Sequence, residues 1–444
     1  MAPKNNHRNR SPIDETIVLL LAAVFCIWYS STEAHEFHGQ TELGRGEQPS
    51  TYNQAISDLN ELLHFPGSNQ LKGVQQSINT ARFTAADLLD LSQGFIDEAR
   101  KDQNEAFFLQ ANRVLEIHDL LFNRSDASDI LRTHILMQFH RFKEAETLAR
   151  KLLVSKQHMA ASILLGDALL DQGRLSEAES YYLAVIRKKM DFSMLARMAS
   201  LRWQQGRHED ALNFWEQCHQ RTQVEAPESQ AWSLTHLGEA YLQEGDTEAA
   251  ANYIQQALFI NPDFAKAHFL MSRIQWYFQK PVPAMRHLEK RMAKPSSFEA
   301  LWWEEDLLFS EGKLCEASEI TRRLLWENAG HDRRLLALYL AYHDTGLVRA
   351  EKLAHEEFQL RQDALTQSIY AFTLFKTGKQ GEAEKHLFAA LDQGYLDART
   401  ALITASITRN TGKREVFEKY LRTAKVLRAA LLPTELDALR SLEE

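Results

Sequence analysis

Cysteine is scarce in this sequence, which has three cysteines among its 444 residues. Cys26 lies in an apolar run near the N-terminus, so at most one disulfide bond can form downstream of it, between Cys218 and Cys315. These two residues fall in different units of a repeating pattern, and we expect both to be unpaired. Disulfide bonds are therefore not expected to hold the fold together, and the cysteines leave the redox compartment open.

An excess of basic residues is also missing. The chain has 51 Lys and Arg against 60 Asp and Glu, a formal net charge of -9, and no basic block beyond the first ten residues. Such a chain repels a phosphate backbone, so nucleic acid is not an expected partner. The 44% of hydrophobic and 25% of charged residues are ordinary for a folded protein and argue against wholesale disorder.

The familiar sequence motifs of catalysis are absent. The chain contains no His-Glu-x-x-His, no Cys-x-x-Cys, no glycine-rich phosphate loop ending in Lys-Ser or Lys-Thr, and no Gly-x-Ser-x-Gly. We therefore expect no catalytic residues, no metal site and no cofactor. The chain is interpreted as a protein that is not an enzyme.

The first 34 residues have the order of a targeting segment. Basic residues precede an uninterrupted apolar run, Ile17 to Tyr29, and polar residues follow it. A membrane span needs about 20 apolar residues, so this shorter run favours a signal peptide, cleaved after Ala34. Two acidic residues just before the run are unusual in a signal peptide, and an N-terminal membrane anchor stays open.

Export sets the expected location of the rest of the chain. We expect it to be periplasmic or exported, on the far side of a bacterial-type inner membrane, or anchored in that membrane through residues 17–29. The alternative is a cytoplasmic protein in which the apolar run forms a buried N-terminal helix. Little in the neighbouring sequence could pack with such a helix.

A repeat of about 33 residues dominates the rest of the sequence. A small residue recurs at separations of 33, 33, 39, 34, 33, 33 and 33, in the order Ala145, Ala178, Ala211, Ala250, Ala284, Ala317, Ala350 and Ala383. Five residues before each alanine a turn is expected, with glycine in most units and His140, Gln279 or Thr345 in the others. This period predicts stacked helical hairpins.

One unit resembles the tetratricopeptide repeat (TPR) family in nearly every signature position: Trp232, Leu237, Gly238, Tyr241, Gly245, Ala250, Ile254, Ala257 and Pro262. A second unit, from Leu165 to Val185, is almost as close to the family pattern. The resemblance implies an all-α fold, a right-handed superhelical solenoid of antiparallel helix hairpins. It is strongest to bacterial envelope-associated members of the family, given the N-terminal segment.

The pattern divides the chain into five segments. Residues 1–34 are the signal peptide or anchor, 35–83 a linker with a short helix, and 84–125 a degenerate repeat or N-terminal cap. Residues 126–430 hold about nine TPR-like repeats, and 431–444 form a C-terminal capping helix that begins near Pro433.

In TPR proteins the first helix of each hairpin lines a concave groove, which grips peptides or protein segments. Aromatic and charged residues recur on these helices, and we predict a peptide-binding groove there. The alternative is that the aromatic residues pack between helices and the charged ones face solvent. The candidate groove residues are Trp203, Phe269, Arg273, Trp276, Trp302, Asp306, Phe309, Leu335, Tyr339, Tyr342, Phe372 and Phe375.

The function favoured by the sequence is a scaffold or adaptor in the cell envelope that binds a protein or peptide partner and assists assembly, export or polymer handling. Two alternatives stay open: a substrate-recruiting subunit of an envelope enzyme complex, and an RNA-binding helical repeat protein. The 33- to 34-residue spacing and the acidic balance count against RNA.

Overall fold

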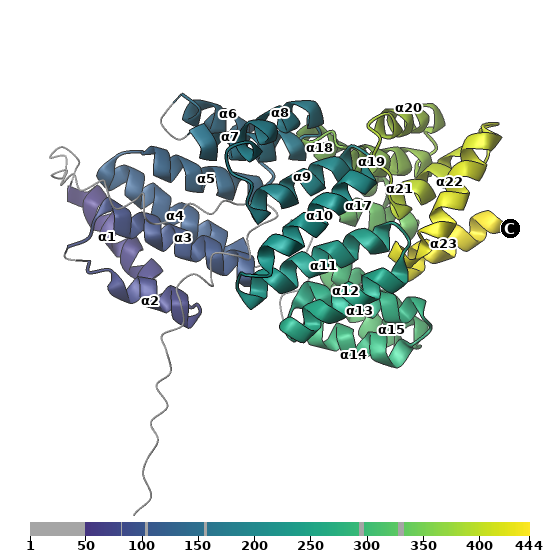
Figure 1. The fold of residues 1–444 in the computed structure, drawn as a ribbon, viewed down its shortest axis with the longest axis horizontal. Helices are drawn as coiled ribbons and strands as arrows, with labels where there is room; N and C mark the ends of the chain where they lie inside the picture. The colour runs from purple at the N-terminus through teal and green to yellow at the C-terminus, as the bar shows by residue number, and fades with distance from the viewer. Residues whose placement is uncertain (1–48, 81, 103–104, 155–157, 293–296, 327–332) are drawn as a thin grey trace, which may run out of the picture.

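A computed structural model describes residues 49–444, except 81, 103–104, 155–157, 293–296 and 327–332. The targeting segment predicted for residues 1–34 lies outside the described residues. Apart from an isolated bridge between Asn79 and Arg82, the described chain has no β-structure, and 23 α-helices and a 3-10 helix account for most of it. The predicted all-α solenoid is confirmed (Figure 1).

Nine consecutive hairpins form the body of the molecule. They are α5–α6 (Asp126–Gln138, Phe142–Leu152), α7–α8 (His158–Asp171, Leu175–Ile186), α9–α10 (Phe192–Gln204, His208–Thr222), α11–α12 (Pro227–Gln243, Thr247–Ile260), α13–α14 (Ala265–Tyr277, Pro281–Met292), α15–α16 (Phe298–Ser310, Leu314–Trp326), α17–α18 (Arg333–Tyr342, Leu347–Leu360), α19–α20 (Ala364–Lys376, Gln380–Leu391) and α21–α22 (Ala398–Thr408, Arg414–Val426). The two helices of each pair pack against each other, and each pair packs on the next; the fifth pair meets the sixth where Trp303 donates to Ser272 Oγ at 2.9 Å.

Each hairpin turns through a residue in the left-handed region of backbone conformation. Glycine takes this role in most hairpins, as Gly173 does with φ of 78°, while His140 and Gln279 adopt it with φ of 55° and 56°. In the α17–α18 hairpin the positive φ falls on Asp344 and Gly346 rather than on Thr345, the residue that the spacing indicated. The amide that follows the turn residue closes the first helix, as Arg174 N does on Leu169 O at 2.9 Å.

Small residues set the distance between the two helices of a hairpin. All eight repeated alanines are fully buried. A Cβ atom on Gly166 would lie 2.4 Å from the ring of Tyr182, and one on Gly238 would lie 2.7 Å from Ile254 Cδ1. At these two mid-helix positions a side chain would collide with the second helix of the same hairpin.

The N-terminal part of the described chain differs from the linker that was predicted. Residues 49–77 form α1 (Pro49–Leu63) and α2 (Asn69–Ser77), two helices rather than one. Their residues Leu59, Leu62 and Leu71 are buried in a common core with α3 (Ala85–Asp102) and α4 (Glu105–Phe122). The leucines of this stretch therefore belong to a folded N-terminal cluster, α1–α4, because they find apolar partners on α3 and α4.

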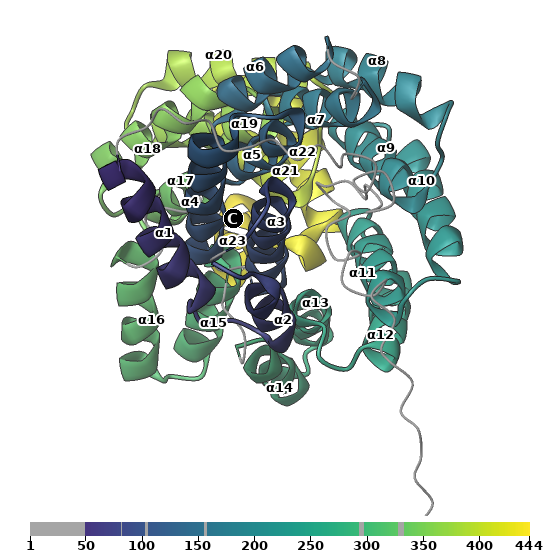
Figure 2. The same ribbon diagram turned by 90° about the vertical axis from the view of Figure 1, so that its left-hand side faces the viewer.

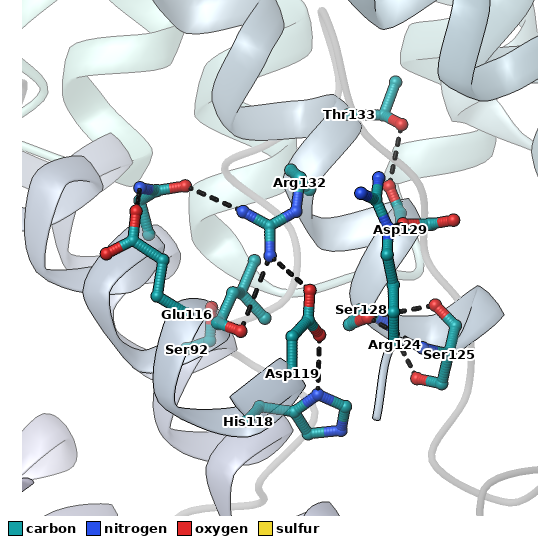
Figure 3. A network of polar contacts seen from close by, with 12 residues as sticks. Ser92, Glu116, His118, Asp119, Arg124, Ser125, Ser128, Asp129, Arg132 and Thr133 are labelled. Carbon is teal, nitrogen blue, oxygen red and sulfur yellow. Dashed lines mark hydrogen bonds and ion pairs between the residues drawn. The ribbon is translucent and has the colours of Figure 1, made fainter. Parts of the chain in front are cut away.

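A polar network joins this cluster to the first hairpin (Figure 3). Arg132 on α5 donates to Asp119 Oδ2 on α4 at 2.7 Å, and His118 Nδ1 lies 2.9 Å from the other oxygen of the same carboxylate. Burial alone would raise the pKa of Asp119, but the hydrogen bonds from His118, Ser128 and Arg132 hold it below its usual value. The junction between the cluster and the repeats is therefore fixed by charge as well as by apolar packing.

The nine hairpins complete a turn and meet each other again (Figures 1 and 2). The intra-hairpin turns of the second, third and fourth hairpins abut the connections that follow the seventh, eighth and ninth. Gln362 N donates to Gln172 O at 3.3 Å, and Lys143 Nζ reaches Gln359 O at 3.3 Å. We call this line of contacts the seam. Repeat spacing alone does not predict it, because the repeat pattern specifies only neighbouring contacts.

The seam depends on glycine at its closest points. A Cβ atom on Gly206 would lie 2.1 Å from the carbonyl oxygen of Gly394, and one on Gly173 would lie 2.8 Å from Asp363 N. Both glycines also have positive φ. At these turns glycine is required both by backbone conformation and by the approach of another part of the backbone.

The C-terminal segment does not simply cap the last hairpin. After α22 the chain forms the 3-10 helix η3 (Arg428–Ala430) and α23 (Pro433–Glu443), which begins at the predicted proline. Both elements turn into the ring: η3 contacts α11 and α13, and α23 contacts α15 and α17 as well as α21 and α22. Figure 2 shows α23 in the middle of the ring of helices. Apolar residues at the end of the chain thus pack on helices far upstream.

Replacing Gly206 by alanine is expected to destabilise the protein more than replacing Gly378. Gly378 also turns a hairpin with positive φ, but a Cβ atom there would meet nothing within 4 Å. Gly378→Ala should therefore cost only the left-handed conformation, about 1–2 kcal/mol. Gly206→Ala should add about 1–3 kcal/mol for the clash at the seam. Urea unfolding of both variants checks this, and equal losses would show that the seam adds nothing to stability.

Candidate functional site

The inner face of the ring carries one equivalent residue from each first helix. Eleven residues before the repeated alanine stand Glu239, Arg273, Asp306, Tyr339 and Phe372. Arg273 and Asp306 contact the C-terminal segment inside the ring, which places this position on the concave side. The first helices of the middle hairpins therefore face the interior of the ring.

Three charged side chains, Arg273, Asp306 and Arg399, bind the C-terminal segment, and a fourth, Glu299, pairs with the two arginines. Arg273 donates to the carbonyl oxygen of Ala430. Asp306 accepts hydrogen bonds from Thr434 N at 3.0 Å and from Thr434 Oγ1 at 2.5 Å. We call Arg273, Glu299, Asp306 and Arg399 the inner charge cluster.

A third member of the cluster, Arg399, holds a buried glutamate of the segment. Arg399 donates through Nε to Glu435 Oε1 at 2.5 Å, and Glu435 is fully buried. Glu299 lies between the two arginines, 3.1 Å from Arg399 Nη2 and 3.7 Å from Arg273 Nη1. Glu435 also accepts from Leu432 N at 2.9 Å, which caps the start of α23. The segment is thus bound by ion pairs in a buried environment, where removing one partner of a pair would destabilise the protein strongly.

Burial disfavours the charged form of the Asp306 carboxylate. Burial raises its pKa to about 7, against the lowering effect of the two hydrogen bonds from Thr434. The neighbouring carboxylates Glu305 and Glu435 raise it further. Docking of Thr434 therefore supplies the donors that an otherwise poorly solvated carboxylate needs.

Four of the predicted aromatic residues form one buried group between α15, α17 and α19. The ring centroids of Trp302 and Tyr339 are 5.4 Å apart, and those of Tyr342 and Phe372 are 4.8 Å apart. Tyr339 donates to Glu305 Oε1 at 2.8 Å. Trp302, Tyr339 and Phe372 are buried and Tyr342 is half-buried, so these residues serve packing between hairpins.

The remaining predicted residues are spread along the inner helices and differ in exposure. Phe269 is buried, and the Cζ atom of the Arg273 guanidinium lies over its ring, 5.5 Å from the ring centroid. Trp203 stacks on His208, with the two ring centroids 4.4 Å apart. Trp276 is half-buried against Trp303 at 6.2 Å. Leu335 and Phe375 are half-buried, and Phe309 is 44% exposed.

The structure thus brings Arg273 and Asp306 together on one bound segment, and groups Trp302, Tyr339, Tyr342 and Phe372. It does not join all twelve predicted residues in a single exposed surface. Binding of a partner peptide by these residues stays a prediction.

The sequence reasoning missed Glu299, Arg399, Thr434 and Glu435. A signal for two of them exists: Glu299 and Arg399 occupy the same place in their repeats, 18 residues before Ala317 and Phe417 respectively. A charged residue at an equivalent position of two first helices could have marked that part of the inner face. No comparable signal connects the C-terminal residues with helices more than 100 residues upstream.

A second charged group lies on α11 and α13, next to the C-terminal segment. Lys266 Nζ is 2.6 Å from Glu239 Oε2, and His236 Nδ1 is 3.3 Å from the same oxygen. Burial alone would raise the pKa of Glu239, but Lys266 and His236 hold it well below its usual value. His236 stacks on Trp215 at 4.9 Å, and burial together with Lys266 lowers its pKa to about 4.

A polar cavity of about 260 Å³ opens at the seam. Asp171, Gln204, Arg334, Asp363 and Tyr395 are among its lining residues, which come from the second, third, seventh and eighth hairpins and from the connections that follow the seventh and the eighth. Burial raises the pKa of Asp171 to about 7, although Arg361 and Arg334 oppose this. Closure of the ring thus creates a cavity between several hairpins that no single hairpin could form.

Within the described ranges, no group of three or more His, Cys, Asp or Glu side chains is arranged to hold a metal ion. Cys218 is buried and Cys315 exposed, and both are free thiols, as expected. None of the helices from α1 onward is long and apolar enough to cross a membrane. Residues 17–29 lie outside the part of the chain on which this can be judged.

Comparison with known families identifies the repeats. Two family models described as tetratricopeptide repeats match residues 134–191 and 191–260. These ranges cover the second to fourth hairpins and part of the first. No curated protein sequence matches the chain.

Several solved structures are similar to this chain at low sequence identity. A TPR protein from Parabacteroides merdae is 16% identical, covering 65% of this chain and 100% of that chain with a TM-score of 0.28. The Cut9–Hcn1 hetero-tetramer of the APC/C is 13% identical, covering 89% and 94% with a TM-score of 0.32. The human IFIT1 dimer with m7Gppp-AAAA is 14% identical, covering 88% and 97% with a TM-score of 0.44.

The nine hairpins and the inner first helices define a helical-repeat solenoid. The two matching repeat models identify the hairpins within residues 134–260 of this solenoid as tetratricopeptide repeats. Tetratricopeptide repeats imply a scaffold for protein–protein interactions.

The burial of His236 predicts that acid destabilises the fold. The unfolded chain binds a proton on this histidine below about pH 6.5, whereas the folded protein does so only below about pH 4. Stability should therefore fall as pH drops from about 6.5 to 4, with a slope of up to about 1.4 kcal/mol per pH unit from this residue. His236→Gln should flatten the pH dependence by that amount while changing stability less at pH 8. Urea titrations at several pH values check this, and an unchanged slope would contradict it.

Proposed function

We propose that this protein is a non-enzymatic adaptor in the cell envelope that binds an extended or helical segment of a partner protein on the inner face of its ring. The observation that carries the proposal is the C-terminal segment itself. The inner face already binds a stretch of polypeptide through a main-chain carbonyl, a main-chain amide and two side chains.

The chemistry of the inner face supports a peptide ligand. Paired arginine and carboxylate groups can select the direction and charge of a bound chain, and aromatic residues supply apolar contact area. Trp276, Phe309 and Phe375 stand three residues after the charged or aromatic inner position and retain exposed surface. A partner segment that extends past the C-terminal segment would contact these rings.

The envelope location rests on the sequence of the first 34 residues. Export would place the ring on the far side of the inner membrane, and an uncleaved anchor would tether it there. An adaptor in this place would assist assembly, export or polymer handling by holding one component close to another.

Replacing the exposed inner aromatic residues is expected to weaken partner capture. Trp276→Ala combined with Phe309→Ala should lower the recovery of cross-linked partners from native cells at least about tenfold, since buried aromatic anchors carry much of the energy of an interface. Phe259→Ala is the matched control, because Phe259 is 88% exposed on α12, a second helix outside the inner face. Equal recovery of partners by the double variant, folded by circular dichroism, and by the control would reject the inner face as the binding surface.

The proposed location of the protein in the cell envelope leads to a separate prediction. Intact-mass analysis of the protein from its native cells should give a mature chain beginning at His35 in the soluble envelope fraction. An uncleaved chain in the membrane fraction would support the anchor instead. A full-length chain in the cytosolic fraction would contradict both forms of the proposal.

A further inference from the structure

The C-terminal segment meets the ring as a ligand meets a receptor. From Ala430 to Glu435 the chain presents, in order, a carbonyl oxygen, two buried leucines, a helix start at Pro433, a threonine and a buried glutamate. The polar contacts of these residues go to helices far upstream, α13 and α15, and to α21. These six residues thus contact three of the four members of the inner charge cluster, Arg273, Asp306 and Arg399.

The order of these groups defines the chemistry that the site accepts. Asp306 stands at the N-terminus of α23, where it receives an amide and a hydroxyl from one residue. A carboxylate in this place is also favoured by the helix dipole. Arg399 receives a carboxylate one residue later, and the two leucines are buried at 2% and 0% exposure. The site therefore recognises the beginning of a helix that has an apolar pair before it and a hydroxyl residue followed by glutamate in its first turn.

The fit of the chain's own segment is incomplete. In the described structure Arg273 Nε and the Tyr342 hydroxyl are buried without a hydrogen-bond partner. Arg273 belongs to the cluster, and the pKa of Tyr342 is affected by Glu435 and Arg399, so both donors border the site. Buried donors without acceptors are costly. A ligand with an additional carboxylate or carbonyl near these donors would bind better than the segment now in place.

We propose that the inner charge cluster is a receptor site for an acidic, helix-starting segment of a partner protein, and that residues 428–443 occupy it until such a segment displaces them. This inference rests on the proposed adaptor function and names the chemistry of the partner. The bound segment follows the ninth hairpin and joins it at Leu427. Displacing it therefore breaks the contacts of residues 428–443, while the nine hairpins keep their contacts with one another.

The tethered segment competes with any free ligand, because a tether of this kind gives a local concentration in the millimolar range. A free peptide with the same sequence should bind the natural chain poorly. It should bind well once the chain's own segment is weakened. This difference is what the experiment measures.

The probe is a fluorescent peptide with the sequence of residues 428–444. Its binding to the chain is measured by fluorescence anisotropy. The receptor is the whole chain carrying Thr434→Ala and Glu435→Ala. We expect this chain to bind the peptide at least tenfold more tightly than the natural chain does. A peptide with Glu435→Gln, or a receptor that also carries Asp306→Asn, should lose at least tenfold in affinity.

Circular dichroism and thermal unfolding establish that the receptor is folded. Should the double variant unfold, Thr434→Ala alone leaves the ion pair between Arg399 and Glu435 intact and serves as the receptor. Failure of a folded receptor to bind the peptide, or equal affinity for the natural and the Glu435→Gln peptides, would overturn the proposal. Dimerisation of the natural chain that excludes the peptide would assign the site to a second copy and would also overturn it.

The peptide experiment and the partner-capture experiment test the two proposals independently of each other. Loss of peptide binding with partner capture intact would remove this inference and leave the adaptor function. Peptide binding without any captured partner would reject the adaptor function while showing that the site accepts a segment in trans.

Discussion

The close approach of backbone to backbone at the seam is the constraint on which the rest of the structure depends. At Gly206 a carbonyl of another hairpin occupies the place that a Cβ atom would take, and Gly173 meets the backbone of Asp363 in the same way. TPR hairpins need a left-handed residue at their turns for local reasons. In this protein the same glycines also let the turns of the second to fourth hairpins touch the connections after the seventh to ninth. A local requirement thus becomes a condition for closing the ring.

Closure determines what the interior must contain. Once the hairpins meet, the inner helices face one another, and charged residues that would be solvated on an open solenoid are removed from water. Arg273, Asp306 and Arg399 would be costly there without partners. The C-terminal segment supplies a carbonyl, an amide, a hydroxyl and a carboxylate to them. Its docking is therefore the consequence of burying charge inside a closed ring.

The part of this architecture that repeats could be predicted from the sequence, because its causes are local. The alanines mark the second helices, and the left-handed turn falls on His140 and Gln279 where the spacing places it. Apart from the pair of Arg399 and Glu435, the seam and the docked segment arise from contacts between residues 128 to 216 positions apart, such as Asp306 with Thr434 and Lys143 with Gln359. No period connects such pairs. The sequence predicts Arg273 and Asp306 as residues of the inner face that bind a partner peptide, whereas in the structure they contact the C-terminal segment of the same chain.

The seam and the inner site are also coupled mechanically. In an open solenoid each repeat contacts only its neighbours, and the groove widens through small rotations that add along the stack. Here the seam ties the second hairpin to the connection after the seventh, so rotations between these hairpins must cancel around the ring. The inner charge cluster is built from the fifth, sixth and ninth hairpins, within or next to that closed path. Its geometry is therefore held nearly fixed. A ligand must then match the site as it stands, which favours a segment that can form its own helix start at the cluster over one that needs the ring to adjust.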